Sequence, residues 1–176
     1  GVFAESDSGG TWGPFLKRAG FDGVVISGKS PKPVYLWVSE GKAEIREATH
    51  FWGKDTYELD PLIRKETRNE AVVASIGPAG EKGVRFASIM NDGKDARAAG
   101  RGGAGAVMGS KNLKAIATRG THDITVAKPD EFMELVKEFH ERMKGPAAQK
   151  YRTLGTPENV LVHNSLACMP TRNYNN

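Results

Sequence analysis

Residues 74–117 read ASIGPAGEKGVRFASIMNDGKDARAAGRGGAGAVMGSKNLKAIA and carry the strongest structural signals in the chain. Apolar runs at 72–76, 84–90 and 113–118 are typical of β-strands. Between the last two runs, residues 91–109 contain six of the 21 glycines of the chain. Glycine has no Cβ, so its backbone N–H groups approach a ligand closely. The block therefore predicts a strand-rich region with a ligand-binding loop.

Regular elements are also expected before this block. A short helix is predicted within 10–19 and a β-branched strand at 23–27. The strands 34–38 and 43–46 are predicted to form a hairpin, with Gly41 supplying a positive φ in the turn.

Helices are expected at two further places. The run 56–68 has a helical pattern, in which Pro61 either starts or kinks the main helix. After about residue 125, Pro129 and two acids precede apolar residues at helical spacing, and a second helix opens near 156–158. These patterns predict an α+β fold: a strand-rich region over 1–125, followed by the start of an α-helical domain over 126–176.

Composition limits the class of protein. The 176 residues are 39% hydrophobic and 26% charged, which excludes collagen-like, low-complexity and strongly acidic disordered chains. No apolar run reaches the ~18 to 20 residues of a membrane span, and the first residues lack a secretory signal pattern. We therefore expect a cytoplasmic protein without a membrane or nucleic-acid partner. We also expect an internal piece of a longer protein, because residue 1 is not methionine and 171–176 contain no terminal element.

The lone Cys168 excludes an internal disulfide and any metal site that needs several thiolates from this chain alone. The net charge of +4 favours anionic ligands only where basic residues cluster. Arg97 and Arg101 form such a cluster in the Gly-rich segment, and they share a face if their turn is helical. Guanidinium groups suit phosphate and planar oxyanions. The Gly-rich segment therefore has two interpretations: an anion-binding site, or a connection between strands that carries two solvated arginines.

Two nucleotide-binding patterns occur out of context. GVVISGKS (23–30) matches the P-loop pattern, but its expected strand lies inside the motif and another strand, not a helix, follows. GRGGAG (100–105) matches the dinucleotide pattern, but the polar NDGKDARAA (91–99) before it is not expected to form a strand. A P-loop-like nucleotide-binding protein is therefore a minor alternative.

A family resemblance rests on three stretches: SDSGGTWGPFLKRAGFDGVVISGKSPKPVYLWV (6–38), IREATHFWGK (45–54) and the block at 74–117. In sequence, order and spacing they resemble the aldehyde ferredoxin oxidoreductase family of tungsten enzymes. The likeness covers nearly the whole chain, whereas proteins of this family are several times longer. The chain resembles the latter part of the family's N-terminal domain and the entry to its second, helical domain.

The resemblance implies a tungsten bis-pyranopterin cofactor (tungstopterin) whose phosphates are bridged by Mg²⁺. The positions that match the family's pterin contacts are Asp7, Gly9, Arg97, Ala98, Gly100 and Arg101. The backbone carbonyls of Asp7 and Ala98 are the implied Mg²⁺ ligands, since this hard cation prefers oxygen. The family usually has Asn in place of Asp7, and a backbone carbonyl ligand survives that change.

The resemblance also implies an activity, in which an aldehyde is oxidised to a carboxylic acid and electrons pass through a [4Fe-4S] cluster to ferredoxin. The cluster cysteines and the acid–base residues are expected beyond Asn176, so no catalytic residue is assigned within this chain. The expected partners are the aldehyde substrate and ferredoxin, and a homodimer is compatible with them. The tungsten subunit of a benzoyl-coenzyme A reductase, which uses the same cofactor for ring reduction, is the alternative within the same resemblance.

Overall fold

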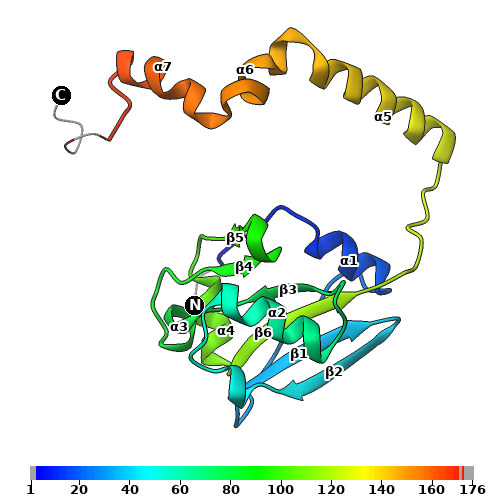
Figure 1. Cartoon of the computed structure of the whole chain (residues 1–176), viewed down its shortest axis with the longest axis vertical. Coiled ribbons are helices and arrows are strands. Elements are labelled where there is room, and N and C mark those ends of the chain that lie inside the picture. Colours follow the sequence, from blue (N-terminus) through cyan, green and yellow to red (C-terminus); the bar gives the residue numbers. More distant parts are fainter. Residues whose placement is uncertain (1–2, 171, 173–176) are drawn as a thin grey trace. The chain divides into compact units, whose positions relative to one another are not determined.

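Six strands form one mixed sheet in the computed structural model, which describes residues 3–170 and 172 (Figure 1). In space the strands are ordered β2-β1-β6-β3-β4-β5. β1 and β6 run parallel, and each of the other neighbouring pairs is antiparallel. The strands are β1 Val34–Ser39, β2 Lys42–Glu47, β3 Val72–Ser75, β4 Ile89–Asn91, β5 Arg97–Ala99 and β6 Leu113–Arg119. The mixed sheet and the helices that follow it confirm the predicted α+β class.

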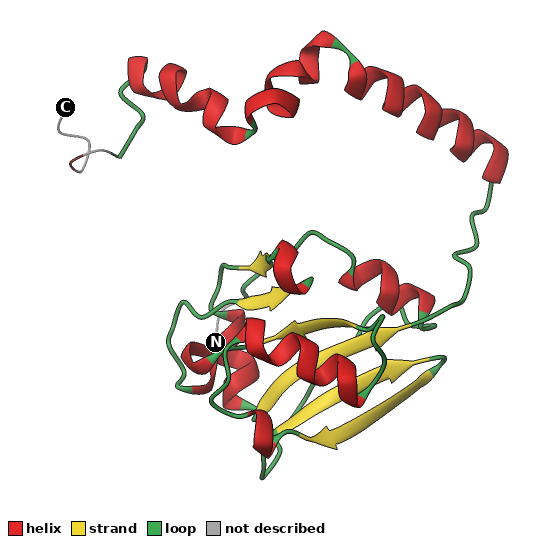
Figure 2. Ribbon diagram, in the orientation of Figure 1, coloured by secondary structure: helices red, strands yellow, loops and turns green. Residues whose placement is uncertain are grey.

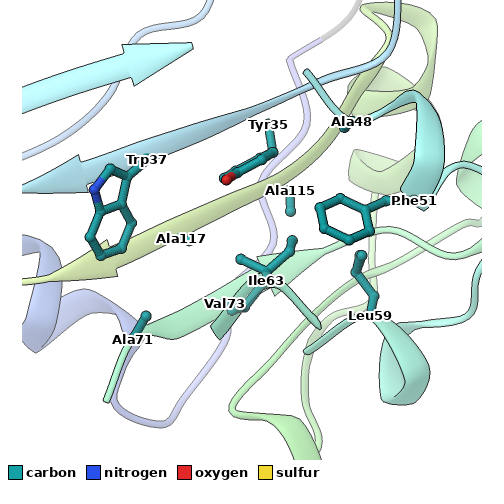
Figure 3. Close-up of a cluster of buried hydrophobic side chains, with 10 residues drawn as sticks. All are labelled: Tyr35, Trp37, Ala48, Phe51, Leu59, Ile63, Ala71, Val73, Ala115 and Ala117. Carbon is teal, nitrogen blue, oxygen red and sulfur yellow. The ribbon is translucent and has the colours of Figure 1, made fainter. Parts of the chain in front are cut away.

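Helices lie on both faces of the sheet (Figure 2). Successive side chains of a strand point to opposite faces, so β1 contributes to two separate cores. Tyr35 and Trp37 pack with Leu59 and Ile63 of α2 on one face (Figure 3). On the other face, Val38 belongs to the cluster that contains residues of α1 and α4. The helices of this part are α1 Trp12–Arg18, α2 Thr56–Glu66, α3 Pro78–Glu81 and α4 Ala104–Ser110, with 3₁₀ turns η1 Thr49–Phe51 and η2 Gly93–Asp95.

Several predicted elements are confirmed. The hairpin β1–β2 turns through Glu40 and Gly41, which both have positive φ. Helix α2 begins at Thr56, after the N-cap Asp55, and continues through Pro61. The N-cap and Glu58 form a capping box, in which each side chain accepts a hydrogen bond from the other residue's backbone N–H.

Other local predictions are wrong. Residues 23–27 form no strand, and Val25 is 98% exposed, because no neighbouring strand pairs with this segment. The strand predicted at 84–90 is shortened to β4, and part of the polar run 91–99 forms the strand β5, which pairs with β4. Three helices were not predicted from the sequence, namely α3, α4 and α6 (Pro146–Leu154).

The chain divides into two compact units, Gly1–Ile124 and Thr125–Asn176. The second unit contains α5 Pro129–Lys144, α6, η3 Thr156–Asn159 and α7 Val160–Ser165. The expected helix starts near 128–131 and 156–158 agree with α5 and η3. None of these helices contains a buried residue. Over the described residues, no helix is both long and apolar enough to cross a membrane.

Candidate cofactor site

Two segments that are far apart in the sequence meet at the β4–β5 edge of the sheet (Figure 1). The side-chain amide of Asn91 donates a hydrogen bond to the backbone carbonyl of Gly9 at 3.0 Å. The backbone N–H of Arg101 donates to Ser6 Oγ at 2.9 Å, and Ser8 Oγ donates to Asn91 Oδ1. All six site residues predicted from the sequence lie in these two segments. We call residues 6–11 the first turn and residues 91–101 the second turn.

β5 contributes two exposed residues, Arg97 and Ala98, to the second turn. Ala98 is opposite Met90 in the β4–β5 pair, and β5 is the last strand of the sheet. Alternate backbone groups of such an edge strand have no partner strand. Asp7, Gly9, Ala98 and Gly100 are all exposed. Backbone oxygens and N–H groups of both turns therefore lie at the surface, where a ligand can reach them.

The two arginines of the second turn are exposed, but they do not share a helical face. Arg97 lies in β5 and Arg101 in the loop after it, so the helical turn considered from their spacing is absent. A Cβ built on Gly9 would lie 3.8 Å from Arg97 Cδ, so the Arg97 side chain runs along the first turn. Arg101 borders a surface groove together with Ser6, Gly102 and other residues.

The charge of both arginines is available to a ligand. Among residues 3–170 and 172, neither Arg97 nor Arg101 forms an ion pair with a carboxylate. The side chain of Arg97 donates only to the backbone carbonyl of Asp95, at 3.3 Å. Unpaired guanidinium groups beside exposed backbone N–H groups suit a phosphate-bearing molecule.

Side chains of the described residues do not gather into a metal-binding cluster. Within the part of the chain that the structure describes, no three His, Cys, Asp or Glu residues come together. The two turns offer backbone carbonyls, backbone N–H groups, two guanidinium groups and the scattered carboxylates of Asp7 and Asp95, whereas Ser6, Ser8, Asn91 and Asp92 are engaged in hydrogen bonds between the turns. This donor set fits an organic cofactor that carries its own metal ligands and has an anionic tail.

A buried carboxylate lies beneath the second turn. Asp60 of α2 is 9% exposed and forms an ion pair with Arg64, with 2.7 Å between Oδ2 and Nε. Its Oδ1 has no hydrogen-bond partner among the described residues. Burial raises the pKa of Asp60 above its ordinary value, although the charge and hydrogen bond of Arg64 oppose this rise; the nearby charge of Asp92 adds a smaller contribution in the raising direction. The turn η2 packs on this carboxylate, since a Cβ on Gly93 would lie 3.1 Å from Oδ2.

Comparison with known proteins decides the family. The family model described as "Aldehyde ferredoxin oxidoreductase, N-terminal domain" matches residues 1–120. The chain belongs to the aldehyde ferredoxin oxidoreductase family. A tungsten-containing aldehyde ferredoxin oxidoreductase of Pyrococcus furiosus is 46% identical over 99% of this chain, which covers 29% of that protein. The chain thus spans less than a third of the length of the relatives it matches.

Relatives whose names state other activities are about as similar. An aliphatic sulfonate oxidoreductase, WOR-like subunit, of Pyrococcus furiosus is 41% identical over 73% of this chain and 22% of its own length. The solved active-site complex BamBC of benzoyl coenzyme A reductase, in complex with 1,5-dienoyl-CoA, is 47% identical. It superposes with a TM-score of 0.75 over 79% of this chain and 21% of that chain. Within the aldehyde ferredoxin oxidoreductase family, identity over this region therefore does not separate the activities.

The nucleotide-binding patterns have other roles in this aldehyde ferredoxin oxidoreductase family member. In the segment 23–30, Ser30 N–H donates to the carbonyl of Lys111 at 3.1 Å, and Lys111 Nζ donates to the carbonyl of Gly28 at 3.1 Å. The chain then enters β1 and not a helix. GRGGAG does lie between a strand and a helix, β5 and α4. However, β6, the next strand in the chain, is not a neighbour of β5 in the sheet, so the motif does not form a dinucleotide-binding βαβ unit.

Sequence reasoning missed the polar residues that join the two turns, namely Ser6, Ser8, Asn91 and Asp92. All four belong to stretches that carry the resemblance to the aldehyde ferredoxin oxidoreductase family, SDSGG and MNDG. Short polar side chains next to glycines in both stretches were the available signal. Nothing in the linear sequence indicated that the two stretches would bond to each other.

Proposed function

We propose that the full-length protein is a tungsten–pterin oxidoreductase. Residues 1–125 form part of its cofactor-binding domain, and residues 126–176 begin a second, helical domain. The observation that carries the proposal is the meeting of the first and second turns, which places two unpaired arginines beside exposed backbone groups of both turns. Family membership supports the same cofactor, since the Pyrococcus furiosus relative is named as tungsten-containing.

Each proposed site residue has a role that follows from its chemistry. Arg97 and Arg101 bind the phosphates of the pterin through charge-assisted hydrogen bonds. Gly9 and Gly100 let the backbone approach the cofactor without a Cβ between them. The backbone carbonyls of Asp7 and Ala98 would hold a Mg²⁺ ion, because this cation takes oxygen ligands from carbonyls and phosphates together. When bound, the tungsten cofactor supplies the two-electron redox chemistry.

For the substrate, we propose an aldehyde. The reaction RCHO + H₂O → RCOOH + 2H⁺ + 2e⁻ releases the electrons that a [4Fe-4S] cluster, with its ligands outside this chain, passes to ferredoxin. The support is the 46% identity with a protein whose name contains both the aldehyde and ferredoxin. Within the full-length protein, the proposed role of this chain is to bind the cofactor.

A second candidate function is reduction of the aromatic ring of benzoyl-coenzyme A. The 47% identity with the benzoyl coenzyme A reductase complex favours it. Both candidates use the same two turns for the same cofactor. They differ in the substrate site, to which we assign no residue of this chain.

The test uses the full-length protein, purified without oxygen. Tungsten measured by mass spectrometry and pterin measured by fluorescence after oxidation report the cofactor. Reduction of ferredoxin by a panel of aldehydes, against conversion of benzoyl-coenzyme A, separates the two activities. Absence of both tungsten and pterin from the protein would reject the proposal.

The site assignment is tested separately by Arg97→Ala and Arg101→Ala. Each loss of a charge-assisted contact costs about 1.5–3 kcal/mol, which weakens cofactor retention by about ten- to a hundredfold. Arg68→Ala, at an exposed arginine outside both turns, is the matched control. Unchanged tungsten and pterin content in both site variants would contradict the assignment.

A further inference from the structure

The side chain of Asp92, which is not among the predicted site residues, joins the two turns through both of its carboxylate oxygens. Its Oδ2 accepts a hydrogen bond from the backbone N–H of Thr11 at 2.6 Å, and its Oδ1 accepts one from Thr11 Oγ1 at 3.1 Å. The neighbouring Asn91 side chain also donates to Asp92 Oδ1, at 3.3 Å. Both carboxylate oxygens are therefore engaged, and the two principal partners lie 81 positions away in the sequence.

Gly10 makes this contact sterically feasible. A Cβ built on Gly10 would lie 1.8 Å from Asp92 Oδ2 and 3.0 Å from Arg97 Cγ. Gly10 also has φ +93, a conformation that residues with a side chain rarely adopt. The carboxylate of Asp92 and the stem of Arg97 thus both lie against the backbone of the first turn at Gly10, where no side chain is in the way.

The backbone of Asp92 is itself in an uncommon conformation. Its φ is +63, in the left-handed region, which Asp tolerates better than most residues. It is also the N-cap of η2, the turn that leads into β5 and Arg97. A backbone held in this region indicates that the surrounding contacts determine it.

We propose that Asp92 is a positioning residue, whose carboxylate holds the first turn against the second so that the cofactor site is formed before the cofactor binds. This inference rests on the proposed function. Asp92 does not bind the phosphates, since its negative charge would repel them and both its oxygens face the first turn. It acts through the backbone at Gly10–Thr11 and through the placement of Arg97.

The physical reason is preorganisation. Without the contact, the first turn is an exposed segment whose ordering cost is met when the cofactor binds. With the contact, that cost is met during folding, and the cofactor finds both turns in place. Removal of the carboxylate therefore accelerates cofactor loss, although no group that touches the cofactor has been changed.

The test compares variants of the full-length protein. Asp92→Gly removes the carboxylate while it accepts the positive φ, and Asp92→Asn keeps one acceptor oxygen. Thr11→Val removes the partner hydroxyl but keeps the backbone N–H. Asp123→Gly is the matched control: it makes the same substitution at an exposed carboxylate outside both turns, which has no hydrogen-bond partner among the described residues.

Two measurements are made on each variant: hydrogen exchange of the Thr11 amide, and the rate at which tungsten and pterin are lost on incubation. Asp92→Gly is expected to accelerate both by about tenfold or more, the effect of one lost hydrogen bond to a charged group. Asp92→Asn and Thr11→Val are expected to have smaller effects, and Asp123→Gly to behave as the unmodified protein. Asp92→Asn is expected to restore part of the slow exchange and of the cofactor retention that Asp92→Gly loses. A general loss of structure at the turn would not be reversed in this way.

Two results overturn the inference. Either the Thr11 amide exchanges equally in Asp92→Gly and in the unmodified protein, or its exchange accelerates while cofactor loss does not. An unmodified protein that contains neither tungsten nor pterin rejects the proposed function instead, and the positioning role with it. The exchange at Thr11 would then still decide whether Asp92 joins the two turns.

Discussion

The two units of the chain differ in how far the apolar residues of their helices are buried. In the first unit, α2 buries Leu59 and Ile63 completely against the sheet. In the second unit, α5 has apolar residues at helical spacing, yet Phe132, Leu135 and Phe139 are 49–59% exposed. Both helices have apolar residues at helical spacing. The difference shows that an amphipathic pattern predicts a helix, whereas only the presence of a packed partner gives that helix stability.

The largest expected difference between the units is in hydrogen exchange of the 176-residue chain. Amides of β6 should open only with the whole first unit, whereas those of α6, a nine-residue helix without buried residues, should exchange nearly as in a free peptide. We expect protection to differ by about a thousandfold or more. Similar protection of β6 and α6, measured by NMR or mass spectrometry, would contradict this comparison.

The next effect concerns a buried ion pair in the first unit. Lys114 of β6 is fully buried, pairs with Glu81 of α3, and donates to the backbone carbonyl of Lys54 at 2.7 Å. Lys114→Met leaves Glu81 charged and unpaired inside the protein, which is expected to cost about 3–5 kcal/mol. Urea unfolding followed by tryptophan fluorescence measures this, because all three tryptophans lie at or before position 52.

The control for this prediction is an exposed pair in the same unit. Lys17 pairs with Asp22, and their side chains are 51% and 86% exposed. Lys17→Met is expected to change the free energy of unfolding by less than about 0.5 kcal/mol, because water screens the pair. Equal effects of the two substitutions would show that burial does not distinguish the pairs.

A smaller effect is expected at the helix starts. Asp55 caps α2 through the backbone N–H groups of Tyr57 and Glu58, both at 2.8 Å, whereas Lys128 gives α5 no side-chain cap. Asp55→Ala should cost the first unit about 1 kcal/mol in urea unfolding. Conversely, Lys128→Ser should raise the helix content of the second unit, measured by circular dichroism. A loss of helix content in that variant would contradict the capping argument.

The smallest effect is on the pH dependence of the first unit. Burial raises the pKa of Asp60 above 3.8, so near that pH the folded protein holds a proton that the unfolded chain has released. The contribution of Asp60 to the free energy of unfolding therefore decreases as the pH rises from 3.8 through the higher pKa of the folded protein, and it increases again as the pH is lowered. Relative to Asp60→Asn, the unmodified chain should gain stability between pH 7 and pH 4. A constant difference across this range would reject the shift.

Prediction from the sequence succeeded where the signal was local. The hairpin β1–β2, the cap of α2 and the start of α5 each follow from residues a few positions apart. Prediction failed at 23–27, where β-branched residues favour a strand but no strand is available to pair with them. A strand needs a partner for its backbone groups, and that partner is distant in the sequence.

At α4 the error is the opposite one: no helix was predicted in this Gly-rich stretch, yet the structure has one. Gly105 and Gly109 lower its intrinsic helix propensity. However, a Cβ on Gly109 would lie 1.9 Å from the carbonyl oxygen of Gly80, so this glycine permits close packing of α3 on α4. A Cβ on Gly105 would lie 2.5 Å from the carbonyl oxygen of Ser88, so this glycine permits close packing of α4 on the segment before β4. The tertiary contact outweighs the local preference, and a reading of propensities alone cannot detect it.

The six proposed cofactor residues came from the resemblance, and their residue types indicated anion-binding chemistry. The contacts that bring their two segments together depend on Ser6, Ser8, Asn91 and Asp92, whose partners lie some 80 to 95 positions away.

By itself, the sequence determined the family, the α+β class, the residue types at the candidate site and the elements with strong local signals. Only the tertiary structure decided that β4 and β5 end the sheet, that the first turn bonds to the second, and that Asp92 joins them. The reason is that backbone conformation and periodicity depend on neighbouring residues, whereas pairing and packing depend on which distant groups satisfy one another's hydrogen bonds and apolar surfaces.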